Sequence, residues 1–274
     1  MCCLFLAASS TVAIAQTSVV DLVNPIIGTN GMGHTFPGAC VPFGLVQLSP
    51  DTDTIPHNVD GKYQPRSYEY CAGYQHKDSS IVGFSHTHFS GTGHSDLGDI
   101  LIMPTTGTLK LNPGTATNPD GGYRSRFSHG TEISRPGYYE VMLTDYGVKA
   151  QLTTTQRVGI HKYTYPTNSE NQRIILDMIH GIYNYDGKVL WTNIRVENDT
   201  LVTGYRITNG WARTNYTYFA MSFSKPITHY GCEEKAKVNY RGGYAKFNMK
   251  ENFPDIGGRK IVAYFDFDPK TSDE

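Results

Sequence analysis

The feature that most constrains this chain is its hydrophobic pattern, which almost never shows a helical period. Short apolar runs alternate with turns rich in Gly, Pro, Asn and Asp, and this pattern favours β-strands. The runs predict strands over residues 41–48, 138–143, 148–155, 158–163, 173–179, 201–207, 216–223 and 260–268. The last of these is so uniformly apolar that we expect it deep inside a sheet. The fold class predicted is all-β, an antiparallel β-sandwich with few and short helices.

Composition supports a folded domain and excludes several classes of partner. The chain has 274 residues, of which 39% are hydrophobic, with 28 Gly and 14 Pro. Its 24 basic and 25 acidic residues leave a net charge of 24 − 25 = −1, so no overall field attracts nucleic acid. No apolar run approaches the ~18 residues that a membrane-spanning helix needs. We therefore expect neither a nucleic-acid partner nor a membrane span.

Residues 1–15 have the pattern of a signal peptide. They carry no charge, and Ala13-Ile14-Ala15 before Gln16 matches a small-x-small cleavage site. The alternative is a buried first strand or helix. Cleavage would leave residues 16–274 as the β-sandwich domain, exported to the periplasm, the cell surface or the medium. Cys40, Cys71 and Cys232 would remain, which is too sparse for a disulfide framework.

The first polar cluster, residues 28–38, is a glycine-rich loop. Gly33, His34 and Phe36 are its candidate ligand-binding residues, because glycine permits close backbone approach to a ligand. Phe36-Pro37-Gly38 prevents a helix from starting there, which argues against a phosphate-binding loop. The loop is either ligand-facing or a plain Ω-loop.

The second cluster, residues 67–74, is rich in tyrosine. Tyr68, Tyr70 and Cys71 lie beside Glu69, and clustered tyrosines near a carboxylate suit a sugar-binding platform. The alternative, which we favour slightly on the residues alone, is a core or edge strand.

The third cluster, residues 84–99, holds His86, His88 and Asp96. On a strand, the two histidines would project from the same face. With His94 and Asp99 they could form a metal shell. His-x-His alone is common, however, so we favour the alternative of hydrogen-bonded histidines packing a glycine-rich loop. Acids such as Glu69, Asp96 and Asp99 are present, but no spacing singles out the acid and base of a glycosidase. No Gly-x-Ser-x-Gly nucleophile elbow is found.

These clusters, together with other long strings, resemble one known family. The strings are residues 23–29, 33–39, 41–51, 71–74, 83–99, 126–129 and 136–139. They resemble the N-terminal domain of glycoside hydrolase family 92, and the similarity runs from about residue 20 to the end of the chain. The family consists of exo-acting α-mannosidases, mostly bacterial and exported, that act on mannan and N-glycans.

The resemblance implies a supersandwich-like β-sandwich followed by an (α/α)6 barrel, with the sugar pocket between them. In the family, calcium holds the mannose 2- and 3-hydroxyls, and a Glu acid and an Asp base hydrolyse the bond with inversion. The family's acid, base and calcium ligands belong to the barrel, which is absent here. We therefore expect no catalytic residue and no metal ligand in this chain, and the sandwich itself is expected to lack its last strand or strands.

For this chain, the resemblance implies only the residues that the β-sandwich contributes to the sugar pocket. The residues expected to bind substrate are Gly33, His34, Phe36, Tyr68, Tyr70, Cys71, His86, His88 and Asp96. The family usually has tryptophan and Asp where this chain has Tyr68-Glu69-Tyr70, a departure that bears on linkage preference.

Three functions remain open from the sequence. The first is the N-terminal fragment of an exported, calcium-dependent, inverting exo-α-mannosidase, inactive alone, whose partners are a mannose-containing glycan and the catalytic barrel. The second is a stand-alone carbohydrate-binding β-sandwich. The third is an independent metal hydrolase that uses His86, His88 and Asp96.

Overall fold

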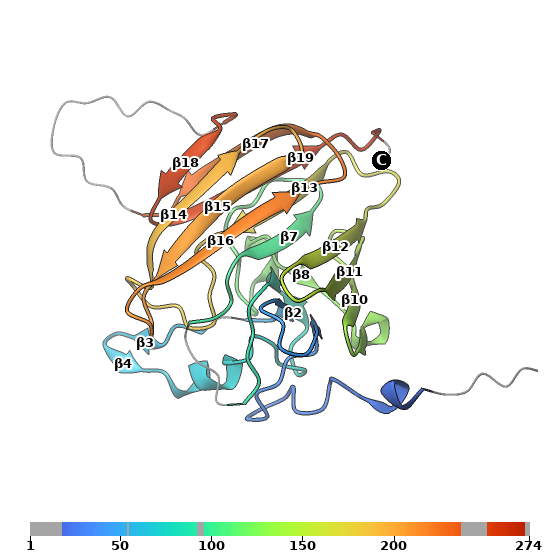
Figure 1. Ribbon diagram of the computed structural model, residues 1–274, viewed down its shortest axis with the longest axis vertical. Helices are drawn as coiled ribbons and strands as arrows, with labels where there is room; N and C mark the ends of the chain where they lie inside the picture. The colour runs from blue at the N-terminus through green and yellow to red at the C-terminus, as the bar shows by residue number, and fades with distance from the viewer. Residues whose placement is uncertain (1–17, 54, 92–95, 237–250, 272–274) are drawn as a thin grey trace, which may run out of the picture.

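Strands supply nearly all regular structure in the computed structural model, which describes residues 18–53, 55–91, 96–236 and 251–271 (Figure 1). The largest sheet has seven strands, and every strand pairing within it is antiparallel. Its spatial order is β1 (Ala39–Cys40), β2 (Gln47–Asp51), β6 (Gly83–Ser85), β7 (Leu101–Thr105), β13 (Gln172–Asp177), β19 (Ile261–Phe267) and β17 (Ile227–Glu234).

Two antiparallel four-stranded sheets accompany this central sheet. One has the order β12 (Gly159–Thr164), β11 (Val148–Thr154), β10 (Tyr138–Leu143) and β9 (Ile133–Arg135). The other has the order β16 (Asn215–Ser222), β15 (Leu201–Thr208), β14 (Val189–Val196) and β18 (Asp255–Gly258).

The remaining elements are short. Two small pairs are β3 (Asn58–Val59) with β4 (Lys62–Tyr63) and β5 (Ser80–Ile81) with β8 (Ser125–Arg126). The helices described are 3₁₀ turns: η1 (Val19–Leu22), η2 (Pro65–Tyr70), η3 (Pro119–Gly121) and η4 (His129–Thr131). None of the described helices is long and apolar enough to cross a membrane.

The central sheet is buried on both faces, so the sandwich has three layers and two cores. Along β19, Val262 and Tyr264 enter one core, whereas Ala263 and Phe265 enter the other. The first core closes against β10 and β11, and the second closes against β14 and β15, the layer drawn in front of β13 and β19 in Figure 1. A strand covered on both faces reads as a continuous apolar run instead of an alternating one, which explains the sequence of β19.

The all-β antiparallel fold predicted from the sequence is confirmed, and most predicted strands lie within a residue or two of their expected bounds. The strand expected over 41–48 is wrong at its start, because a turn closed by the Gly44 N–H on the Val41 carbonyl (3.0 Å) precedes β2. The strand alternative for residues 67–74 is also wrong, because Pro65 starts the 3₁₀ helix η2 there. The predicted signal peptide, residues 1–15, lies outside the described residues.

Candidate functional site

The three polar clusters of the sequence meet in space. The ring of His34 packs edge-on against Tyr68, with centroids 4.6 Å apart, and Phe36 packs on His88 with centroids 5.3 Å apart. The Gln75 side chain accepts from the Gly31 N–H (2.7 Å) and donates to the Gly31 carbonyl (2.9 Å). We call the surface formed by His34, Phe36 and Tyr68 the aromatic wall. It joins segments that are far apart in the chain.

The loop that carries this wall is held by its own backbone. A Cβ on Gly33 would lie 2.1 Å from the Gly28 carbonyl oxygen, so only glycine fits this close approach. The Thr35 N–H donates to the same carbonyl (3.3 Å). The sequence predicted that Gly33 permits close approach to a ligand. In the structure, Gly33 approaches the backbone of Gly28 in the same loop. Gly33 remains exposed.

His34 is held in an unusual conformation. Its φ is +53°, in the left-handed region, and its carbonyl accepts from the Gly91 N–H (2.8 Å). Its ring is 7% exposed, yet Nε2 has no hydrogen-bond partner among the described residues. Because a buried polar atom without a partner costs stability, this nitrogen is a place where a ligand or another protein surface would be favourable.

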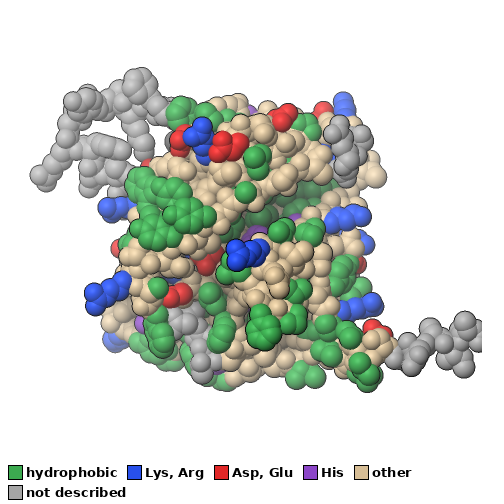
Figure 2. All heavy atoms as spheres, in the orientation of Figure 1, with side chains coloured by type: hydrophobic (Ala, Val, Ile, Leu, Met, Phe, Trp, Pro, Cys, Tyr) green, Lys and Arg blue, Asp and Glu red, His purple; other side chains and the backbone are tan. Residues whose placement is uncertain are grey.

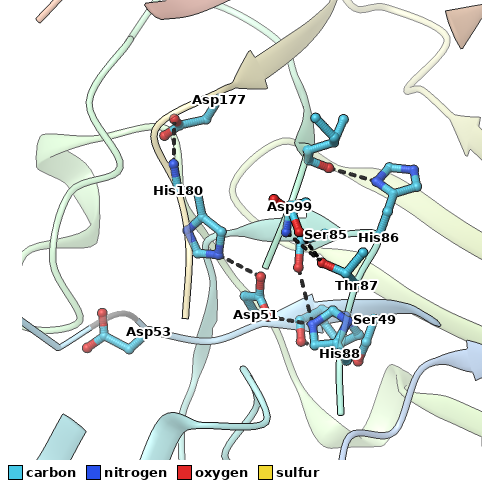
Figure 3. Close-up of polar contacts among 12 residues, drawn as sticks. Ser49, Asp51, Asp53, Ser85, His86, Thr87, His88, Asp99, Asp177 and His180 are labelled. Carbon is cyan, nitrogen blue, oxygen red and sulfur yellow. Dashed lines mark hydrogen bonds and ion pairs between the residues drawn. The ribbon is translucent and has the colours of Figure 1, made fainter. Parts of the chain in front are cut away.

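Behind the wall lies a buried network centred on Asp51, at the end of β2 (Figure 3). Its two carboxylate oxygens contact two imidazoles: Oδ1 lies 2.8 Å from His88 Nε2, and Oδ2 lies 2.7 Å from His180 Nε2. Burial by itself would raise the pKa of the Asp51 carboxyl, but the two histidines outweigh burial and hold its pKa well below the usual range. Asp51 is therefore an anion paired on both sides.

His88 is positioned from both of its ring nitrogens. Nδ1 lies 2.7 Å from the Gln47 carbonyl, while Nε2 faces Asp51 and also lies 3.2 Å from Ser85 Oγ. Each ring nitrogen of His88 thus faces an oxygen atom, and the two contacts fix the orientation of the ring. A Cβ on Gly73 would collide with Asp51 and His88, so the second cluster packs directly on this pair.

A second buried pair ties the site to the front layer of the fold. Arg206 of β15 lies 2.8 Å from Asp99, and it donates to the carbonyls of Met178 and His180. Asp99 also accepts from Thr87 Oγ1 (2.8 Å). The guanidinium therefore holds the loop after β13 against the loop after β6, where His180 and His88 reach Asp51.

Sequence reasoning missed Asp51, His180 and Arg206 as members of this network. One signal was available for Arg206, because it occupies an inward position in the alternation of β15, beside Val202 and Thr208. A charged residue at such a position predicts a buried partner. Asp51 and His180 lie 129 residues apart, and no local pattern connects them.

His86 points to a different neighbour from His88. Its Nδ1 donates to the Ile100 carbonyl (2.7 Å), and its Nε2 lies 3.0 Å from His161 Nε2 on β12. His161 Nδ1 in turn accepts from Tyr163 Oη (2.7 Å). Burial lowers the pKa of His86 to about 4 and holds the pKa of His161 well below its ordinary value, so both rings stay neutral. Each of these hydrogen bonds therefore has a defined donor and acceptor.

The other predicted binding residues are engaged elsewhere. Tyr70 is buried and donates to Asp78 (3.2 Å), and Cys71 packs in a small core with Ile182 and Tyr183. Asp96 accepts from the backbone of Trp211 (2.9 Å) and Ala212 (3.1 Å). The structure thus brings His34, Phe36, Tyr68 and His88 together and separates His86 from them. A role in substrate binding stays a prediction for all nine residues.

The carboxylates nearest this site are engaged by other side chains of the chain. An inverting glycosidase needs an acid and a base about 6.5–9.5 Å apart across an open space. Asp51 and Asp99 are 0% and 2% exposed and are already bonded, Asp51 by His88 and His180 and Asp99 by Arg206. Glu69 lies at the surface and is paired with Lys77 (2.5 Å).

The residues described here do not fit the calcium site that the resemblance implies. Calcium takes six to eight oxygen ligands. Among the described residues, the one cluster of three metal-binding side chains is His76, His129 and Glu132, which offers two imidazole nitrogens. His86, His88 and Asp96 each bond a different partner.

Comparison with known proteins agrees with the fold. Residues 22–274 match the glycosyl hydrolase family 92 N-terminal domain. A solved family 92 α-mannosidase from Bacteroides thetaiotaomicron, in complex with mannoimidazole, is 40% identical, with a TM-score of 0.78 over 93% of this chain and 31% of its own.

Two further relatives are more distant. An uncharacterized secreted glycosidase from Arthroderma benhamiae is 28% identical over 59% of this chain and 19% of its own length. A family 92 inverting mannosidase from Bacteroides thetaiotaomicron VPI-5482, 24% identical, shares the fold with a TM-score of 0.65 over 94% of this chain and 31% of its own. This chain thus spans a third or less of the length of these relatives. It belongs to glycosyl hydrolase family 92, and it corresponds to the N-terminal domain of that family.

Proposed function

We propose that this chain is the N-terminal domain of an exported, calcium-dependent, inverting exo-α-mannosidase that acts on mannose-containing glycans. In this proposal the chain forms one side of the sugar pocket and is inactive by itself. The acid, the base and the calcium ligands come from an (α/α)6 barrel outside this sequence. When bound, calcium would orient the sugar hydroxyls, and the residues of this chain would position the sugar ring.

The observation that carries the proposal is the aromatic wall with its unpartnered nitrogen. Ring faces stack on the C–H faces of sugars, and His34 Nε2 is free, among the described residues, to bond a hydroxyl. The Asp51 network and the Arg206–Asp99 pair fix the loops behind the wall, so the surface is rigid before a ligand arrives.

A second feature supports a missing partner domain. Residues 19–45, here called the amino-terminal segment, expose Leu22 (78%), Ile27 (74%), Leu45 (67%) and the whole of Phe43. Figure 2 shows hydrophobic side chains along the lower edge of the molecule, where Figure 1 places this segment. Exposed apolar surface of this kind is typical of a protein–protein or domain interface.

The test compares the chain alone with the chain mixed with a separately produced C-terminal domain of the 40%-identical Bacteroides α-mannosidase. We expect no release of mannose from mannan by either part alone, and calcium-dependent release by the mixture. His34→Ala should abolish most of the release by the mixture. Tyr63→Ala, an exposed aromatic outside the wall, should not.

Two outcomes would contradict this proposal. Mannose release by the chain alone would show that it carries its own acid and base. Saturable mannan binding by the chain alone, lost in Tyr68→Ala, would establish the alternative of a stand-alone carbohydrate-binding module.

A further inference from the structure

A second cluster of titratable side chains lies outside the candidate site. His76 follows the second sequence cluster, and His129 and Glu132 lie at the start of η4 and immediately after it. Each offers one ligand atom, and these three atoms lie within 4.8 Å of one another. His129 Nδ1 is 2.8 Å from Glu132 Oε2. Two ligands about 2.0 Å from a tetrahedral zinc ion lie about 3.3 Å apart, so small side-chain rotations would complete a shell.

The carboxylate of Glu132 is buried and is oriented by two tyrosine hydroxyl groups. Its side chain is 3% exposed, and Oε1 accepts from Tyr74 Oη (2.9 Å) and Tyr139 Oη (2.6 Å). Such outer hydrogen bonds orient carboxylate ligands in metal sites.

The buried Glu132 carboxylate has a histidine as its ion-pair partner. No Lys or Arg side chain in the described ranges makes a hydrogen bond or ion pair with Glu132 in the structure; its ion pair is with His129. The rings of His76 and His129 are only 4.0 Å apart between centroids. Two protonated imidazoles at that separation would repel each other, whereas one divalent cation bound to both would satisfy the carboxylate and the rings together.

Both histidines are held in place before any metal binds. Phe127 packs edge-on against His129 with centroids 5.0 Å apart. The N–H of His76 donates to the Thr29 carbonyl (2.8 Å), and Ser128 Oγ accepts from the Gly130 N–H (3.2 Å) at the start of η4. The cluster therefore joins the loop before β5 to the loop before β9.

We propose that His76, His129 and Glu132 bind a divalent transition-metal ion, with Zn²⁺ as the best match. Two imidazoles and one carboxylate are zinc ligands, and His129 lies exposed at the surface. Nitrogen ligands do not suit calcium, so zinc fits this donor set better than calcium does. Bound metal would fasten η4 to residues 74–76 and stabilise the folded chain by mass action.

The test starts from the whole chain dialysed against a chelator and then against metal-free buffer. Zinc chloride is titrated calorimetrically, bound metal is counted by elemental analysis, and the unfolding temperature is recorded with and without zinc. The variants are His129→Ala, which removes a side chain at the surface, Glu132→Gln, and the matched control His57→Ala outside the cluster.

We expect wild type and His57→Ala to bind one more equivalent of zinc than His129→Ala and to unfold at a higher temperature when zinc is present. Glu132→Gln should bind zinc more weakly, and calcium chloride should leave the unfolding temperature unchanged. Equal zinc uptake by wild type and His129→Ala would overturn the proposal, as would no uptake by wild type. In either case the cluster would be an ordinary histidine–glutamate ion pair.

Discussion

The amino-terminal segment and the central sheet use the same apolar residue types with opposite results. In β19, each residue from Ile261 to Phe265 is at most 6% exposed, because neighbouring side chains enter cores on opposite faces. In the amino-terminal segment, Leu22 and Phe43 are almost wholly exposed. The three layers bury the strand within this chain, whereas no described residue covers Leu22 and Phe43. Apolar residues of this sequence therefore form exposed surface as well as core.

The largest test of this comparison uses one phenylalanine from each region. Phe265→Ala empties a site buried between two layers and should lower the free energy of unfolding by about 3–5 kcal/mol. Phe43→Ala removes an equal side chain from solvent and should change it by less than about 0.5 kcal/mol. Urea unfolding of both variants measures the difference. Similar losses would show that Phe43 is covered in solution.

A second test concerns the polar contact between β12 and the end of β6. The pKa of His86 is about 4 in the folded chain, below its ordinary value of 6.5. The contribution of His86 to stability is therefore complete above pH 6.5. It is lost as the pH falls toward 4, because the unfolded chain then takes up a proton that the folded chain does not. At 1.36 kcal/mol per pKa unit, the loss at pH 5 is about 2 kcal/mol.

Urea unfolding from pH 7.5 to pH 4.5 checks this expectation. His86→Gln removes the titrating group, so the variant should lose less stability than wild type across that range. Parallel pH profiles for the two proteins would contradict the neutral pairing of His86 with His161.

The smallest change in stability is expected for a double variant of two exposed residues in the amino-terminal segment. Phe43→Ser combined with Leu22→Ser should leave the free energy of unfolding within about 0.5 kcal/mol of wild type. The same double variant should reduce self-association of the chain, since exposed apolar patches promote it. Light scattering across a concentration series measures the effect. Unchanged self-association would remove the support that this segment gives to a missing partner domain.

The sequence predicted the fold class and most of the strands of six or more residues, because hydrophobic periodicity is local. The hairpin of β10 and β11 and the buried position of β19 could be read from residues close in the chain. β14 and β17 were not predicted, since polar and apolar residues are mixed in them without a clear period. The 3₁₀ helix at Pro65 was missed because tyrosines suit a strand equally well.

The candidate site was only partly predictable. The sequence pointed to His34, Phe36, Tyr68 and His88, which the fold brings together, but it also grouped His86 with His88. Their separation depends on β12, which presents His161 to one histidine, and on β2, which presents Asp51 to the other. Binding roles for these residues remain predictions until the sugar experiments are done.

The sequence by itself determined that the chain forms antiparallel sheets and belongs to family 92, because strand periodicity and ordered strings of residues are properties of neighbours along the chain. Only the tertiary structure decided that Asp51 sits between His88 and His180, that Arg206 fastens the loops behind the aromatic wall, and that His76, His129 and Glu132 converge. The reason is physical. Buried charges must find partners, and in a fold of crossed-over strands those partners come from segments tens of residues or more away.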